Sequence, residues 1–189
     1  MPLIRGCHPG DMFMKIISTI LFVVLMIASP AFGQSKEKLD PEKDSPNRKA
    51  VNGFGGHLIV VENPREFIQQ WLKPAPPKIK SVSDVKRGEP IGAFVLFAGC
   101  KPDAQGACNS EVDYVIYKPD GSVHVERKNL PLWKEQVPPS TNIQLSRAIL
   151  GMRFGNDEPA GEYKVIAKVS DLNANVSFEL KTKFRLQKK

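Results

Sequence analysis

The chain has 189 residues, of which 41% are hydrophobic and 25% are charged, and its formal net charge is +7. This length suits one domain with a short extension. The basic residues are scattered rather than clustered, which is typical of a solvated surface and argues against a nucleic-acid-binding protein. A weak attraction to anionic glycans or lipid headgroups is compatible with the charge.

The first 33 residues have the parts of a secretory signal peptide. Lys15 precedes an apolar run, residues 16–28, and small residues follow at Ala31 and Gly33. The run is shorter than the ~20 residues of a membrane-spanning helix. We therefore predict that residues 1–33 are removed and that the remainder is periplasmic or secreted, with no stable membrane span. An uncleaved signal that anchors the protein is the alternative, and initiation at Met12 or Met14 would give a more ordinary signal.

The segment after the signal, residues 34–56, is rich in Lys, Glu, Asp, Pro and Asn and has few apolar residues. Such a composition does not supply enough apolar surface for a packed core. The sequence predicts a disordered linker over 34–56 and one domain over 57–189.

A short strand at residues 57–61 is followed by a predicted helix. Asn63 is a good N-cap, and Pro64 fits the first helical turn. Apolar residues then recur at helical spacing before a group of prolines ends the pattern. These apolar residues are Phe67, Ile68, Trp71 and Leu72.

From residue 78 onward the pattern changes to strands. Short apolar or alternating runs are separated by turns, and the clearest hairpin has the turn sequence Lys-Pro-Asp-Gly at residues 118–121. The run at 90–97 is almost continuously apolar, as expected of a central strand. The pattern predicts a mostly β protein, an antiparallel β-sandwich of about seven strands with one short N-terminal helix.

The penultimate predicted strand opens with Gly161-Glu162-Tyr163. A tyrosine at this place matches the tyrosine corner of immunoglobulin-like sandwiches, in which the phenol hydroxyl bonds to the preceding loop. Val165 stands where antibody domains have the second cysteine of their inter-sheet disulfide. We therefore expect an immunoglobulin-like domain without that bridge.

Three cysteines are present, and Cys7 would leave with the signal. Cys100 and Cys108 then form an even pair around a short Gly- and Pro-containing loop, which in an oxidising compartment predicts a local disulfide. A reactive dithiol and a metal pair are weaker alternatives, because the spacing is not that of a redox motif and no histidine lies near it. The predicted bridge fixes the shape of the loop.

Several short patterns occur together in one order. They are Phe-Ala-Gly-Cys at 97–100, Leu-Pro-Leu-Trp at 130–133, Gln-Leu-Ser at 144–146 with Leu-Gly at 150–151, Gly-Glu-Tyr at 161–163, and the helix that carries Phe67 and Trp71 before its prolines. In this order they resemble a group of small, uncharacterised exported proteobacterial proteins with a single immunoglobulin-like domain. The resemblance covers roughly residues 57–186. It implies a fold and an exported location, but no activity and no functional residue.

The sequence contains no recognisable catalytic, metal or cofactor motif. His124 alternates with two valines and is expected on an exposed face, and His57 adjoins the linker, so neither is placed with other ligands. Ser146 lacks the glycines of a nucleophile elbow. We predict no enzyme, no metal and no cofactor, with a hydrolase as a weak third possibility.

Two surface regions are candidates for binding a partner. One is the clipped loop, residues 101–107, with Lys101 at its start. The other is the Pro-rich segment around Trp133 and Lys134, where the tryptophan either plugs the sandwich or is an exposed anchor. The favoured hypothesis is a non-catalytic interaction module that binds an envelope protein or glycan. The alternative is a structural or accessory subunit of an envelope assembly that uses sheet-edge strand addition.

Overall fold

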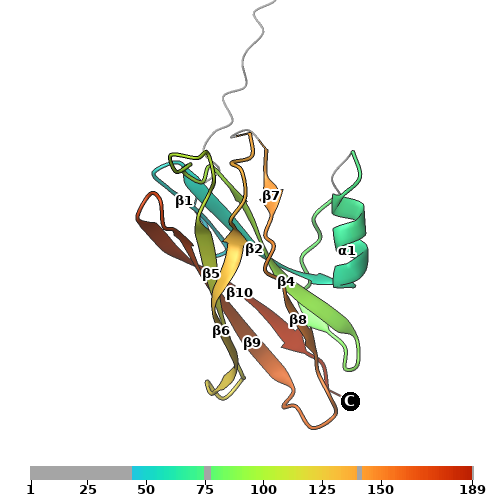
Figure 1. Cartoon of the computed structure of the whole chain (residues 1–189). Helices are drawn as coiled ribbons and strands as arrows, with labels where there is room; N and C mark the ends of the chain where they lie inside the picture. Colours follow the sequence, from blue (N-terminus) through green and yellow to red (C-terminus); the bar gives the residue numbers. More distant parts are fainter. Residues whose placement is uncertain (1–43, 75–77, 140–141, 189) are drawn as a thin grey trace, which may run out of the picture. The chain divides into compact units, whose positions relative to one another are not determined.

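The computed structural model describes residues 44–74, 78–139 and 142–188. The predicted signal peptide and residues 34–43 of the predicted linker lie outside this part of the chain. Within it, ten strands and one helix follow one another (Figure 1). They are β1 (Arg48–Val51), β2 (Phe54–Glu62), α1 (Pro64–Trp71), β3 (Asp84–Val85), β4 (Pro90–Ala98), β5 (Ser110–Tyr117), β6 (Val123–Trp133), β7 (Gln144–Leu145), β8 (Leu150–Arg153), β9 (Gly161–Asp171) and β10 (Val176–Leu186).

The strands form two five-stranded sheets that pack as a β-sandwich, so the predicted mostly β class is confirmed. One sheet has the order β1-β2-β4-β7, with β8 also pairing with β4, and the other has the order β3-β10-β9-β5-β6. All pairs are antiparallel except β3 with β10. The described residues contain more strands than the predicted seven because four are segments of only two to four residues.

The domain begins earlier than residue 57, which corrects the C-terminal part of the predicted linker. Residues 48–56 form β1 and the start of β2, which pair as a hairpin. Phe54 is only 1% exposed and packs against Phe97 and Phe178, with ring centroids 6.5 and 5.7 Å away. The polar composition of the segment hid this hairpin, since its attachment rests on one buried aromatic residue and on backbone hydrogen bonds such as that from Lys181 to the Pro46 carbonyl.

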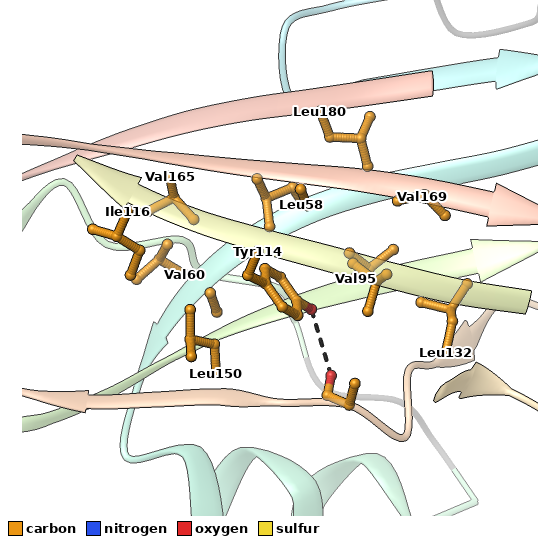
Figure 2. Close-up of a cluster of buried hydrophobic side chains, with 14 of the residues drawn as sticks. Leu58, Val60, Val95, Tyr114, Ile116, Leu132, Leu150, Val165, Val169 and Leu180 are labelled. Carbon is orange, nitrogen blue, oxygen red and sulfur yellow. Dashed lines mark hydrogen bonds between the residues drawn. The ribbon is translucent and has the colours of Figure 1, made fainter. Parts of the chain in front are cut away.

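The core lies between the sheets and consists mainly of alternating residues from β2, β4, β5, β9 and β10. Figure 2 shows Tyr114 of β5 among aliphatic side chains from both sheets. Its hydroxyl donates to the Ala148 carbonyl at 3.4 Å, and burial raises the pKa of Tyr114. A buried phenol is tolerated in this core because its hydroxyl has a hydrogen-bond partner.

Helix α1 covers the outer face of the sheet at β2 and β4. Phe67 packs against Ile59, Val61 and Phe94 in a second apolar cluster. These two strands are therefore buried on both faces, which is why the residues of β4 read as a continuous apolar run. No helix in the described part of the chain is long and apolar enough to cross a membrane.

The two ends of α1 differ from the prediction. Asn63 adopts a left-handed conformation with φ 47°, and its side chain makes no capping hydrogen bond. Leu72 is 79% exposed rather than part of the apolar face, because the helix ends at Trp71.

Candidate functional site

The disulfide predicted from the cysteine spacing is present. Cys100 and Cys108 are bonded, with Cα atoms 5.9 Å apart, and both are buried against the core. The intervening residues 101–105 are exposed. Gly99 precedes the bridge with φ 78°, and a Cβ atom there would lie 2.0 Å from the Gly53 carbonyl oxygen. The bridge therefore holds the base of the loop in the core while its tip faces solvent.

A buried carboxylate holds the loop from the side of the β9–β10 turn. Asp171 is 1% exposed, and its oxygens accept backbone N–H bonds from Lys101 at 2.7 Å, Asn173 at 3.1 Å and Ala174 at 3.2 Å. The Asn173 amide in turn donates to the carbonyls of Lys101 and Ala107. Backbone N–H groups satisfy the carboxylate where water cannot reach it. The sequence marked this region only as a turn, because its partners lie about 70 residues away.

The Pro-rich segment lies beside the same loop. Cys108 donates its backbone N–H to the Glu135 carbonyl, and Val137 donates to the Gly106 carbonyl, both at 2.9 Å. The Gln136 side chain donates to the Gln105 carbonyl at 3.3 Å. The two candidate regions of the sequence thus form one surface. We call it the clipped-loop surface and define it as residues 101–107 with residues 134–137.

Trp133 connects the clipped-loop surface to the core. Its indole N–H donates to the Gln136 carbonyl at 3.0 Å, and its ring packs against Phe97 at 5.8 Å. The guanidinium of Arg147 lies over the indole ring, 4.6 Å from the ring centroid, in a cation–π contact. Trp133 is half-buried, so of the two interpretations the structure favours the plug.

The two predicted lysines have different surroundings. Lys134 is exposed and forms an ion pair with Glu111 at 2.6 Å. Lys101 is exposed at the start of the loop, and its backbone is held by Asp171. Both side chains reach solvent on the clipped-loop surface.

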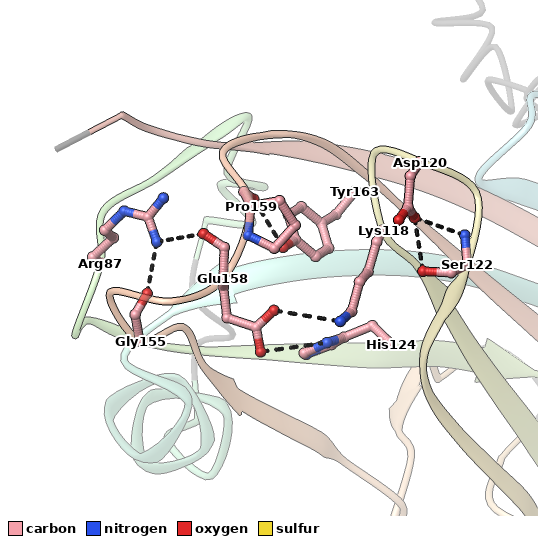
Figure 3. Close-up of polar contacts among 9 residues, drawn as sticks. All are labelled: Arg87, Lys118, Asp120, Ser122, His124, Gly155, Glu158, Pro159 and Tyr163. Atoms are coloured by element: carbon pink, nitrogen blue, oxygen red, sulfur yellow. Dashed lines mark hydrogen bonds and ion pairs between the residues drawn. The ribbon is translucent and has the colours of Figure 1, made fainter.

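The opposite end of the sandwich contains the predicted corner tyrosine (Figure 3). The Tyr163 hydroxyl donates to the Pro159 carbonyl at 2.9 Å, four residues upstream, as the corner requires. Burial, with the nearby charge of Glu158, raises the pKa of Tyr163 to about 12. Gly161 has φ 138°, and a Cβ atom there would lie 2.9 Å from the Pro119 ring, so glycine is required for this close approach.

His124 lies at this end and does not have the exposed position that the alternation predicted. Val125 pairs with Ile116 and Val123 with Tyr117, so His124 is the extra residue of a β-bulge. The bulge turns its ring inward, onto Phe154 at a centroid distance of 5.2 Å. Its Nδ1 lies 3.7 Å from Glu158 (Figure 3).

The remaining candidates for chemistry have structural roles. His57 is half-buried on β2, with its Nε2 3.1 Å from the Asn47 side-chain nitrogen, and burial followed by the charge of Arg48 lowers its pKa. The Ser146 hydroxyl is buried and donates to the Ala148 carbonyl at 2.8 Å. Among the residues that the structure describes, no three His, Cys, Asp or Glu side chains converge as metal ligands.

Comparisons with known proteins do not place the chain in a family. No family model matches it, and no curated protein is similar in sequence. Similar solved structures include a family 123 glycoside hydrolase from Clostridium perfringens, at a TM-score of 0.39 and 9% identity over 71% of this chain and 27% of the hydrolase. Another is a superoxide reductase (neelaredoxin) from Ignicoccus hospitalis, at a TM-score of 0.34 and 11% identity over 58% of this chain and 78% of the reductase. The chain spans about a quarter of the hydrolase, and at these TM-scores neither likeness bears on what it does.

Proposed function

We propose that the protein is an exported, non-catalytic interaction module that binds a protein or glycan of the cell envelope through the clipped-loop surface. The observation that carries this proposal is the way the exposed loop is held. A disulfide fixes the base of the loop, and the buried Asp171 carboxylate fixes its start. The Pro-rich segment forms backbone hydrogen bonds with the end of the loop. A loop ordered before binding loses less conformational entropy when a partner binds.

The alternative of strand addition has less support from the sheet edges. Two long strands have an open edge among the described residues. One is β10, which β3 covers only at Arg185 and Leu186, and whose solvent-facing side chains include the charged Glu179, Lys181 and Lys183. The other is β6. Three consecutive charged residues, 126–128, lie in it, and its pairing with β5 is interrupted by three register shifts. Charges and bulges on an edge strand prevent pairing with another chain.

The sandwich is proposed to be immunoglobulin-like. In that class strands A, B and E share one sheet and strands C, F and G share the other. The orders β2-β4-β8 and β10-β9-β5 follow this arrangement when β4 is taken as strand B and β9 as strand F. The corner tyrosine then stands near the start of strand F, which also supports the assignment.

Site-specific photo-crosslinking in cells that export the protein tests the interaction. A photoreactive residue at Gln105 should give a discrete crosslinked product. Partner peptides are found by mass spectrometry of the product if the partner is a protein, and glycan hydrolysis returns the product to the mass of the uncrosslinked protein if the partner is a glycan. The matched control is Ser122, an exposed turn residue at the other end of the strand that follows the loop. Equal products from both positions, or none from Gln105, would refute the proposal.

A further inference from the structure

The outer face of the second sheet carries an excess of positive charge at one end. Along β9 and β10 alternate residues enter the core, and the residues between them face solvent. The register places Lys183 directly opposite Lys164, Lys181 opposite Ile166, and Arg185 opposite Glu162. Because directly paired residues project from the same face, these cations share one surface.

The fold itself does not require this arrangement. Like charges directly opposite on neighbouring strands destabilise a sheet, and Lys164 faces Lys183 in this way. Glu162 contacts Lys183 at 2.8 Å, and this hydrogen bond with the charges of Lys164 and Arg185 lowers the pKa of Glu162. On its other side Arg185 lies in register with Asp84 of β3. Two carboxylates therefore lie among three cations, and Glu162 is the one that adjoins the two lysines.

The rest of the face is balanced in charge. Lys168 lies in register between Glu179 of β10 and Asp113 of β5. Lys181 also contacts Glu179, at 3.1 Å. The unbalanced charge is thus centred on the opposed pair Lys164 and Lys183, and we call these two residues together with Arg185 the cationic face patch.

An aromatic side chain adjoins the patch. Tyr117 of β5 pairs with Lys164, and it alternates with the buried Ile116, so it projects from the outer face. Two ammonium groups and a phenol ring thus stand in one row across three strands. Phenol rings offer an apolar face for the C–H groups of a sugar ring and a hydroxyl for its polar groups, while ammonium groups bind carboxylates.

We propose that the cationic face patch, together with Tyr117, binds a linear anionic polysaccharide. Residues two apart on a strand are about 6.8 Å apart, and neighbouring strands are about 4.8 Å apart. The patch therefore presents three cations at intervals of this size on an open sheet face, which an extended chain of uronate-type sugars can follow. This surface is separate from the clipped-loop surface, and the inference does not depend on the function proposed for that surface.

A membrane surface is a poorer match for the same face. A planar anionic bilayer would meet the whole face, including the carboxylates of Glu179 and Asp113, whereas a polysaccharide chain contacts only a strip. The apolar residues between the cations, Ile166 and Val115, are half-buried in the sheet rather than protruding. They offer no anchor that could enter a bilayer.

Binding of the exported protein to alginate, a linear polyuronate, tests this inference at about 50 mM salt. Alginate should bind, neutral dextran should not, and the Lys164→Gln, Lys183→Gln double variant should bind alginate at least about fivefold more weakly. Tyr117→Leu should weaken binding by about threefold without changing its salt dependence. The matched control is the Lys73→Gln, Lys80→Gln double variant, which removes the same charge from exposed positions beside α1, on the outer side of the other sheet.

The possible outcomes are distinct. The proposal is overturned if alginate does not bind, or if both double variants lose affinity equally, because the latter would indicate attraction by net charge alone. It is also overturned if vesicles of phosphatidylcholine with about 25% phosphatidylglycerol bind through Lys164 and Lys183 while alginate does not. Thermal unfolding of each variant shows that it is folded, and removal of the like-charge pair should not lower its midpoint. Crosslinking from Gln105 is unaffected by these variants, so the two proposals fail separately.

Discussion

Asp171 and Tyr163 each hold one end of the sandwich through a buried polar side chain. Asp171 accepts hydrogen bonds from three backbone N–H groups, which belong to the clipped loop and the β9–β10 turn. Tyr163 binds the carbonyl of Pro159 in the loop before β9. A buried polar group that is fully satisfied specifies one loop geometry, because every alternative leaves it without a partner.

Removal of the Tyr163 hydroxyl should measure how much the tyrosine corner contributes to the free energy of unfolding. Tyr163→Phe leaves the Pro159 carbonyl without its donor, so we expect the free energy of unfolding to fall by about 1–1.5 kcal/mol. Urea unfolding monitored by fluorescence gives this quantity. Tyr117→Phe, which removes a hydroxyl from the solvent-facing side of β5, is the control and should change it by less than about 0.5 kcal/mol. Equal effects in the two variants would contradict a special role for the corner.

His57 should make the stability depend on pH. Its pKa is lowered in the folded protein by burial and by Arg48, so the folded state favours the neutral ring. The stabilisation is complete above the unfolded-state pKa of about 6.5 and declines as the pH falls through that value towards the folded-state pKa. The free energy of unfolding should thus be lower at about pH 5 than at about pH 7.5. In His57→Gln the difference between the two pH values should shrink, and an unchanged difference would assign the effect to other groups.

Individual strands show why local patterns were sufficient in some places and not in others. β10 alternates without interruption, and its buried face follows from the sequence alone. In β6 the bulge at His124 reverses the alternation of buried and exposed residues, and no turn residue in the sequence indicates the bulge. The β1–β2 hairpin was missed because its one large apolar residue, Phe54, stands among glycines. A bulge or a single anchoring residue depends on the neighbouring strand, which a local pattern does not contain.

The clipped loop should depend on its disulfide for order rather than for most of the domain's stability. Replacing Cys100 and Cys108 by alanine releases a loop of about nine residues, so the free energy of unfolding should fall by at most about 2.5 kcal/mol. Hydrogen exchange of the Lys101 and Val137 amides should increase, while that of β9 and β10 is maintained. Labelling the unreduced protein should find no free thiol at either position, and full labelling would contradict the bridge.

The assembly of the domain joins segments that are far apart in the sequence. The disulfide and the corner tyrosine were predictable because each involves residues fewer than ten positions apart. The sequence predicted the clipped-loop surface only as two separate regions. The contacts that hold them together join Gln136 to a residue about 30 positions away and Asp171 to one about 70 positions away. The cationic face patch likewise exists only once β9 and β10 are in register. Such sites need the topology as well as the composition.

The ordered domain should require its first hairpin. A chain that starts at residue 44 retains β1 and Phe54, whereas one that starts at His57 loses both, along with the backbone hydrogen bonds from Leu58 to Asn47 and from Lys181 to Pro46. We expect the shorter chain to lose at least about 3 kcal/mol, the typical effect of removing one buried phenylalanine side chain. The longer one should unfold like the full chain. Phe54→Ala in the full chain separates the side chain from the hairpin and should cost about 3–5 kcal/mol. If the chain starting at His57 unfolds at the same urea concentration as the longer one, residues 44–56 are a tether after all.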